Sequence, residues 1–239
     1  MRLLFCGVAL TSLLLNANVK SGNAYTVDDV FENFRKAYNE SRNFSADFEE
    51  TIFRDGVKSS SRGELTFSKP NLLRKRTINQ KDPTQLVQLI VLDGSYSWAY
   101  TPLLNQVNKM KLSNPEHEPL LPGIDASLQD VQKNYDMKLV VDEVANRKGV
   151  YQLELTPRPH MLSKPLDGGQ SPRETLEMWI QAKDWLPIQF GYKLQYDTES
   201  NVIGIISLTN IKRDQKLDTG FFKFDIPNGA EVIDISPKE

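Results

Sequence analysis

The clearest structural signal in the chain is the stretch IQFGYKLQY, residues 188–196. Apolar side chains occupy every second position, and glutamine, glycine and lysine fill the positions between them. A period of two is typical of a β-strand with one face buried. Similar stretches recur along the chain with turn residues between them, which predicts a mostly antiparallel sheet.

The alternating stretches predict strands at residues 44–52, 63–69, 86–92, 96–100, 138–142, 150–156, 175–182, 188–196, 202–211 and 222–226. Two turns join neighbouring strands into hairpins, one at residues 54–56 and one at Asp93-Gly94, a dipeptide suited to a tight turn. A sheet of this many strands tends to curl.

An amphipathic helix precedes the first strand. Thr26 and Asp29 have the spacing of a capping box, and the predicted helix ends near Asn39. Its apolar residues follow a spacing of three and four: Val27, Val30, Phe31, Phe34, Ala37 and Tyr38. Because only one side of this helix is apolar, it needs a surface to cover, and one face of the sheet is available.

The strand signals lapse between Leu112 and Asp136, where we expect a proline-containing loop followed by a short helix over residues 125–135. Residues 157–172 predict a long surface loop. The chain as a whole therefore predicts an α+β protein of the mainly β kind, a single domain over residues 25–239.

The N-terminus reads as a signal peptide over residues 1–24. Arg2 precedes the apolar run 3–15, which is too short to span a bilayer, and the small residues Gly22 and Ala24 favour cleavage before Tyr25. A lipidated cysteine is expected at the end of the apolar run, whereas Cys6 lies near its start. We therefore expect that the mature chain is not lipidated. We expect a soluble, exported chain with no disulfide.

Charge and motifs exclude several classes of function. Without residues 1–24 the chain has 27 basic and 31 acidic side chains, a formal net charge of −4, which disfavours a general nucleic-acid binder. His117 and His160 lie apart in loops, which argues against a metal site, and no nucleophile motif accompanies them. We therefore expect no cofactor and no enzymatic activity. The basic run Arg74-Lys75-Arg76 indicates a solvated strand edge, or less readily a contact with a partner.

The aromatic residues on the predicted strands allow two interpretations. They either fill an ordinary core, or they line a dry cavity of the kind in which small barrels hold apolar ligands. The pattern alone leaves both open.

Several strings in a fixed order resemble the LolA family of periplasmic carriers of outer-membrane lipoproteins. They are the strings at residues 43–48, 63–71, 91–100, 153–157, 185–187 and 222–232. The resemblance implies an incomplete antiparallel β-barrel with a helical lid, enclosing a hydrophobic cavity for acyl chains. It also implies a periplasmic monomer that accepts acylated lipoproteins from an inner-membrane LolCDE-type ABC transporter and delivers them to a LolB-type receptor.

On this basis we assign expected site residues. Candidates for the cavity wall are Ile52, Leu65, Phe67, Ile90, Leu92, Trp98, Tyr100, Met178, Ile180, Phe190, Tyr192 and Leu194. Candidates for the lid and its latch are Phe31, Phe34, Lys69, Leu120, Leu121 and Leu128. Pattern fixes which residues share a strand face but not which face points inward.

Two departures from the family pattern matter. The family typically has arginine before the Pro-Asn that ends the second strand, where it bonds carbonyl groups of the lid, whereas this chain has Lys69. Lysine offers a point charge instead of a planar fork, so we expect a latch of altered strength. The aromatic residue often found shortly after is replaced within residues 73–76, which could change the shape of the cavity.

Three other functions stay open at this level. A carrier of another lipid or glycolipid would share every feature and differ in its ligand. A sensor of mislocalised lipoproteins would usually need a second domain. A secreted hydrolase would need a nucleophile and a base that the sequence does not assemble.

Overall fold

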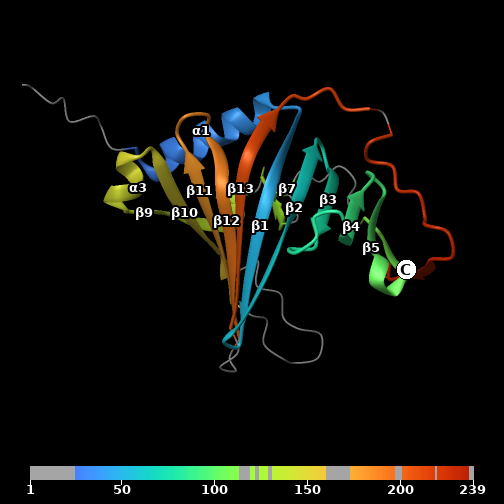
Figure 1. Ribbon diagram of the computed structural model, residues 1–239. Coiled ribbons are helices and arrows are strands. Elements are labelled where there is room, and N and C mark those ends of the chain that lie inside the picture. The colour runs from blue at the N-terminus through green and yellow to red at the C-terminus, as the bar shows by residue number, and fades with distance from the viewer. Residues whose placement is uncertain are drawn as a thin grey trace, which may run out of the picture.

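A computed structural model describes residues 25–112, 119–121, 124–128, 131–159, 173–196, 201–218 and 220–236 (Figure 1). The predicted signal peptide, His117 and His160 lie outside these residues. The first part of the chain forms α1 (Val27–Glu40), β1 (Asn43–Arg54), β2 (Val57–Ser68), β3 (Leu72–Ile78), β4 (Leu86–Leu92), β5 (Tyr96–Thr101), a single 3₁₀ turn η1 (Pro102–Leu104) and β6 (Gln106–Lys111). The remainder forms β7 (Pro119–Leu121), β8 (Ile124–Ser127), α2 (Val131–Asn134), β9 (Tyr135–Val140), α3 (Glu143–Arg147), β10 (Val150–Pro157), β11 (Arg173–Gln181), β12 (Leu186–Gln195), β13 (Asn201–Arg213) and β14 (Glu231–Asp234).

Twelve of the strands form one sheet in the order β14-β6-β5-β4-β3-β2-β1-β13-β12-β11-β10-β9. All neighbours are antiparallel except β14, which pairs parallel with β6. The long strand β1 lies at the centre of the sheet, between β2 and β13 (Figure 1). Because β9 and β14 each have one neighbour in this order, the sheet stays open. The structure thus confirms the predicted mainly β fold with an incomplete barrel.

Helix α1 covers one face of the sheet, which we call the inner face. Thr26 and Asp29 form the predicted capping box: the Thr26 hydroxyl accepts from the Asp29 N–H, and the Asp29 carboxylate accepts from the Thr26 N–H. The apolar side of α1 is buried, and the helix contacts β9, β10 and β12 where it crosses one end of the strands (Figure 1). The opposite side of the sheet is the outer face.

The segment from Asp125 to Tyr135 corrects the sequence prediction. Residues 124–127 form β8, which pairs with β7, and of the described residues in this segment only 131–134 are helical. Tyr135 begins β9, where its neighbour across the sheet is Pro157. Leu128 and Val131 are nevertheless buried in the main core, so their apolar character reflects packing on the sheet and not a continuous helical face.

The last predicted strand is also wrong. Residues 222–226 form no strand; they belong to a segment, residues 214–218 and 220–230, that we call the C-terminal strap. The strap follows the outer face, where the Phe224 ring stacks on Trp98 at 5.4 Å and the Arg74 side chain contacts Phe221. The chain then pairs as β14 with β6, a parallel contact between distant segments that a local pattern does not predict.

The basic run at residues 74–76 does not lie at an edge of the sheet. It lies in β3, which pairs with β2 on one side and β4 on the other. Arg74 is placed under the strap, and Lys75 points to the inner face beside Leu65. The expectation of a solvated edge strand is therefore wrong.

Candidate ligand-binding face

The inner face is lined by apolar side chains packed beneath α1. Phe34 and Tyr38 of the helix contact each other, and the Tyr38 ring lies 6.1 Å from both Phe44 and Phe67 on the sheet. These side chains are almost fully removed from solvent. The part of the inner face beneath α1 is thus an apolar surface in contact with a helix.

Ten of the twelve predicted wall residues lie on this face. Five are buried in the main core: Leu65, Phe67, Met178, Ile180 and Phe190. Leu92 and Tyr192 are partly buried and pack against them. Three half-buried residues share this face, because each lies opposite an inner-face position of the neighbouring strand. They are Ile52 opposite Gly204, Ile90 opposite Lys75, and Leu194 opposite Val202.

Trp98 and Tyr100 lie on the outer face. Trp98 is paired with Val91, whereas Leu92 is paired with Ser97, so Trp98 and Leu92 point to opposite sides. Trp98 contacts the strap through Phe224. The tight turn at residues 93–94 sets this register, and a shift of one residue would reverse the two faces.

The predicted lid residues divide into two groups. Phe31, Phe34 and Leu128 are buried in the main core under the inner face. Leu120 and Leu121 lie on β7, and their side chains are outside the described residues. The predicted latch Lys69 donates a hydrogen bond from its Nζ to the Asn39 carbonyl oxygen at 3.2 Å, at the end of α1.

Charged groups on the inner face were missed by the sequence analysis. The Lys75 Nζ lies 2.9 Å from Glu50 Oε2, and the side chains are only 20% and 16% exposed. Burial raises the pKa of the Tyr192 hydroxyl, the Glu50 carboxylate raises it further, and Arg54 lowers it. One trace of this pair was visible in the sequence, since the aromatic residue often found in the family is replaced within residues 73–76. That departure did not indicate that Lys75 pairs with Glu50 on β1.

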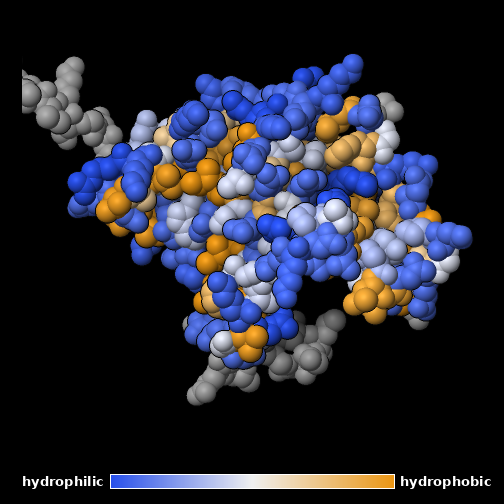
Figure 2. Space-filling view, viewed as in Figure 1, coloured by the Kyte–Doolittle hydropathy of each residue, from blue (hydrophilic) through white to orange (hydrophobic). Residues whose placement is uncertain are grey.

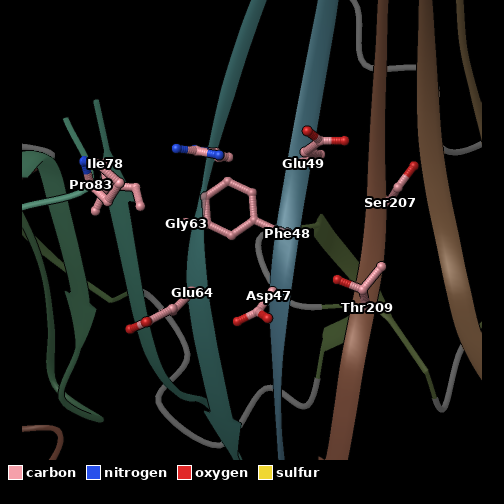
Figure 3. A pocket seen from close by; sticks show the side chains of 10 residues that line it. Asp47, Phe48, Glu49, Gly63, Glu64, Ile78, Pro83, Ser207 and Thr209 are labelled. Carbon is pink, nitrogen blue, oxygen red and sulfur yellow. The ribbon is translucent and has the colours of Figure 1, made fainter. Parts of the chain in front are cut away.

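Two hollows in the described part of the chain lie away from the buried core of this face. One, of about 390 Å³, is bordered by outer-face residues such as Asp47, Glu49, Arg62 and Glu64 (Figure 3). A smaller one, of about 280 Å³, lies near the β1–β2 turn and is lined by Phe53 and Ile203. Among the described residues, the part of the inner face beneath α1 is packed with the buried side chains of the main core.

The visible surface is mostly hydrophilic, with separate apolar patches (Figure 2). One patch lies where Figure 1 places η1, and there Leu103 is 92% exposed. Within the described ranges, no group of histidine, cysteine and acidic residues could hold a metal ion. In the same ranges, each helix is too short or too polar to cross a membrane.

The fold and this face define a class of protein: an open, curled β-sheet whose apolar inner face is closed by a helix. Comparison with known families agrees with that class and is more specific. The family model described as "Outer membrane lipoprotein carrier protein LolA" matches residues 39–165, more than half of the chain. The chain belongs to the LolA family.

Curated relatives carry the name outer-membrane lipoprotein carrier protein. The protein of Francisella philomiragia is 26% identical over 231 residues, which is 95% of this chain and 96% of that protein. The protein of Xylella fastidiosa strain Temecula1 is 38% identical over 103 residues, 43% of this chain and 44% of that protein. In the latter match the chain thus spans less than half of its relative.

A solved structure titled as a LolA superfamily protein from Nitrosomonas europaea aligns with 84% of this chain and 99% of its own, at 14% identity and a TM-score of 0.41. A conserved protein from Thermus thermophilus aligns with 88% of this chain and 99% of its own, at 13% identity and a TM-score of 0.49.

Proposed function

We propose that the mature chain, residues 25–239, is a single-domain periplasmic carrier that shields the acyl chains of lipoproteins. The observation that carries this proposal is the buried apolar cluster between α1 and the inner face, in a chain of the LolA family. Binding would require α1 and the segment around Leu128 to move away from the sheet, so that acyl chains replace their side chains.

The energetics favour this exchange. Each methylene removed from water contributes about 0.8 kcal/mol, so a 16-carbon chain contributes roughly 12 kcal/mol before the costs of binding. Exposing Phe31, Phe34 and Tyr38 costs about 2 to 3 kcal/mol each. Since burial is not directional, we expect tolerance to the peptide sequence of the cargo.

The transfer route is part of the proposal. Cargo would arrive from an inner-membrane LolCDE-type ABC transporter and leave to a LolB-type receptor at the outer membrane. The carrier itself would need no covalent chemistry and no cofactor; ATP hydrolysis by the transporter and tighter binding by the receptor would give direction. Release of lipoprotein from transporter-containing vesicles that depends on ATP and on this chain would test the first step.

Native mass spectrometry tests the carrier function directly. The chain is purified from the periplasm of cells that also produce a bacterial lipoprotein, and the bound species is identified by fragmentation. The control is the same lipoprotein with its lipidated cysteine replaced, which removes the acyl chains. We expect a complex with the acylated form alone.

Two other results contradict the proposal in different ways. Bound phospholipid or glycolipid without lipoprotein would indicate a carrier of another lipid on the same fold. A folded protein that binds no acylated species would indicate that the inner face is an ordinary hydrophobic core.

A further inference from the structure

The charged pair Glu50 and Lys75 lies on the apolar inner face. Glu50 shares this face with Ile206, its neighbour on β13, and Lys75 shares it with Leu65 on β2. The two charged side chains join β1 to β3 across the intervening strand β2, and Ser61 adds a hydrogen bond to Glu50 at 3.4 Å.

Gly63, on the strand between Glu50 and Lys75, has no room for a side chain. Gly63 is paired with Phe48, whose ring reaches from β1 toward β2 (Figure 3). A Cβ atom at Gly63 would lie 1.8 Å from the Arg76 carbonyl oxygen and 3.0 Å from the Phe48 ring. The Lys75 Nζ lies 4.7 Å from the centre of the same ring. The Lys75 ammonium group is therefore contacted by the Glu50 carboxylate and by the Phe48 ring.

Stability alone does not explain a charged pair at this position. Removing two charges from water is costly, and apolar residues of similar size often stabilise a protein as well or better. An ammonium group has three N–H donors, and within the described residues the Lys75 ammonium donates a hydrogen bond only to Glu50. The group therefore retains donor capacity on a face whose buried core is apolar.

On the basis of the proposed function, we propose that Lys75, held by Glu50, binds the ester carbonyl groups that join acyl chains to the glycerol of the cargo. A carbonyl oxygen accepts a hydrogen bond from the ammonium and needs no counter-charge. The pair is neutral as a whole, so it favours a neutral ester over an anionic headgroup, which Glu50 would repel. The pair thus makes the face selective for ester-linked acyl groups.

The test compares two synthetic lipopeptides with identical peptides and chain lengths. One has two palmitoyl chains in ester linkage to glycerylcysteine, and the other has two hexadecyl chains in ether linkage, without carbonyl groups. We expect the native chain to bind the ester form about tenfold more tightly, the effect of one charge-assisted hydrogen bond in a dry site. Equal affinities for the native chain would overturn the inference while leaving the carrier function intact.

Two double variants complete the test. In Glu50→Met with Lys75→Met, both charges are removed together, and the ester preference is expected to disappear. The matched control is Glu177→Met with Lys193→Met, which removes an ion pair of 2.8 Å on the outer face and is expected to keep the preference. If the first variant keeps the preference, Lys75 is not its source. If the native chain binds neither lipopeptide, the proposed carrier function fails and the inference fails with it.

Discussion

The ammonium group of Lys69 caps the C-terminal end of α1 from outside the helix. It donates a hydrogen bond to the Asn39 carbonyl oxygen at 3.2 Å and lies 4.7 Å from the centre of the Tyr38 ring. The last turn of α1 contains no basic residue of its own. Lys69 therefore supplies the positive charge that the end of a helix favours, and it ties α1 to the connection after β2.

Replacement of Lys69 by methionine is expected to loosen α1. We predict a loss of about 1 kcal/mol in the free energy of unfolding, because a charge-assisted hydrogen bond and a cation–π contact disappear. Urea titration measures this effect. Lys58→Met is the control, since Lys58 also lies over an aromatic ring, that of Phe53, but on an exposed hairpin; equal losses in both variants would argue against a role in holding α1.

Replacement of Lys69 by arginine tests the latch itself. The planar guanidinium group can bond two carbonyl groups at once, so we expect a tighter closed state and slower uptake of acylated cargo than in the native chain. Stopped-flow measurement with a fluorescent acyl probe gives the rate. Identical uptake rates for the native chain and Lys69→Arg would contradict the latch hypothesis.

Gly204 is expected to be intolerant of a side chain. The Tyr192 ring lies across it on the inner face, and a Cβ atom there would approach two ring carbons to 2.3 Å. Gly204→Ala should therefore displace Tyr192 and lower the free energy of unfolding by about 2 kcal/mol. Gly220→Ala is the control, because its Cβ would meet nothing within 4 Å; a difference below about 0.5 kcal/mol between the two variants would contradict the packing.

The C-terminal strap is expected to depend on Phe224. Its ring stacks on Trp98 with 18° between the planes, and Trp98 also donates a hydrogen bond from its Nε1 to Asp93 at 2.7 Å. Phe224→Ala should expose one face of the indole, lower the free energy of unfolding by about 1 to 2 kcal/mol and shift the tryptophan emission to longer wavelength.

Hydrogen exchange locates the effect. Amides of β14 should exchange faster in Phe224→Ala, since the strap leads into that strand, and those of β12 should be unchanged. Unchanged exchange in β14 would show that the strap is held by other contacts, such as the hydrogen bond from Asn105 to the Gly229 carbonyl at 2.8 Å.

Glu174 is expected to make stability depend on pH. Burial raises the pKa of its carboxyl group above the usual value of 4.5, so the folded chain retains this proton to a higher pH than the unfolded chain does. The contribution of Glu174 to stability is therefore lost as pH rises from 4.5 through its raised pKa. Glu174→Gln should be more stable than the native chain at pH 7, and the difference should shrink as pH falls to 4.

Urea titrations at pH 7 and pH 4 give this comparison. Glu49→Gln, at an exposed position of β1, is expected to change stability by less than about 0.5 kcal/mol at pH 7. A native chain that is more stable than Glu174→Gln at pH 7 would show that the carboxylate has a stabilising partner.

Local signals in the sequence determined the elements whose stabilising groups are close along the chain. The capping box at Thr26 and Asp29 predicted the start of α1, and Asp93-Gly94 predicted the hairpin of β4 and β5. Alternation also predicted that Phe44 and Phe48 share a buried face. Each of these depends on the backbone period or on contacts a few residues apart, which sequence displays directly.

Only the tertiary structure decided what lies opposite each face. It placed Trp98 outside under the strap, brought Lys75 to Glu50 across β2, and joined β14 to β6 from a distant part of the chain. The physical reason is that alternation fixes which side chains point the same way, whereas burial and pairing depend on partners far away in sequence. The composition of residues 74–76 predicts a solvated strand edge. Lys75 lies instead on the inner face of the sheet, because β2 and β4 pair with β3 on its two sides.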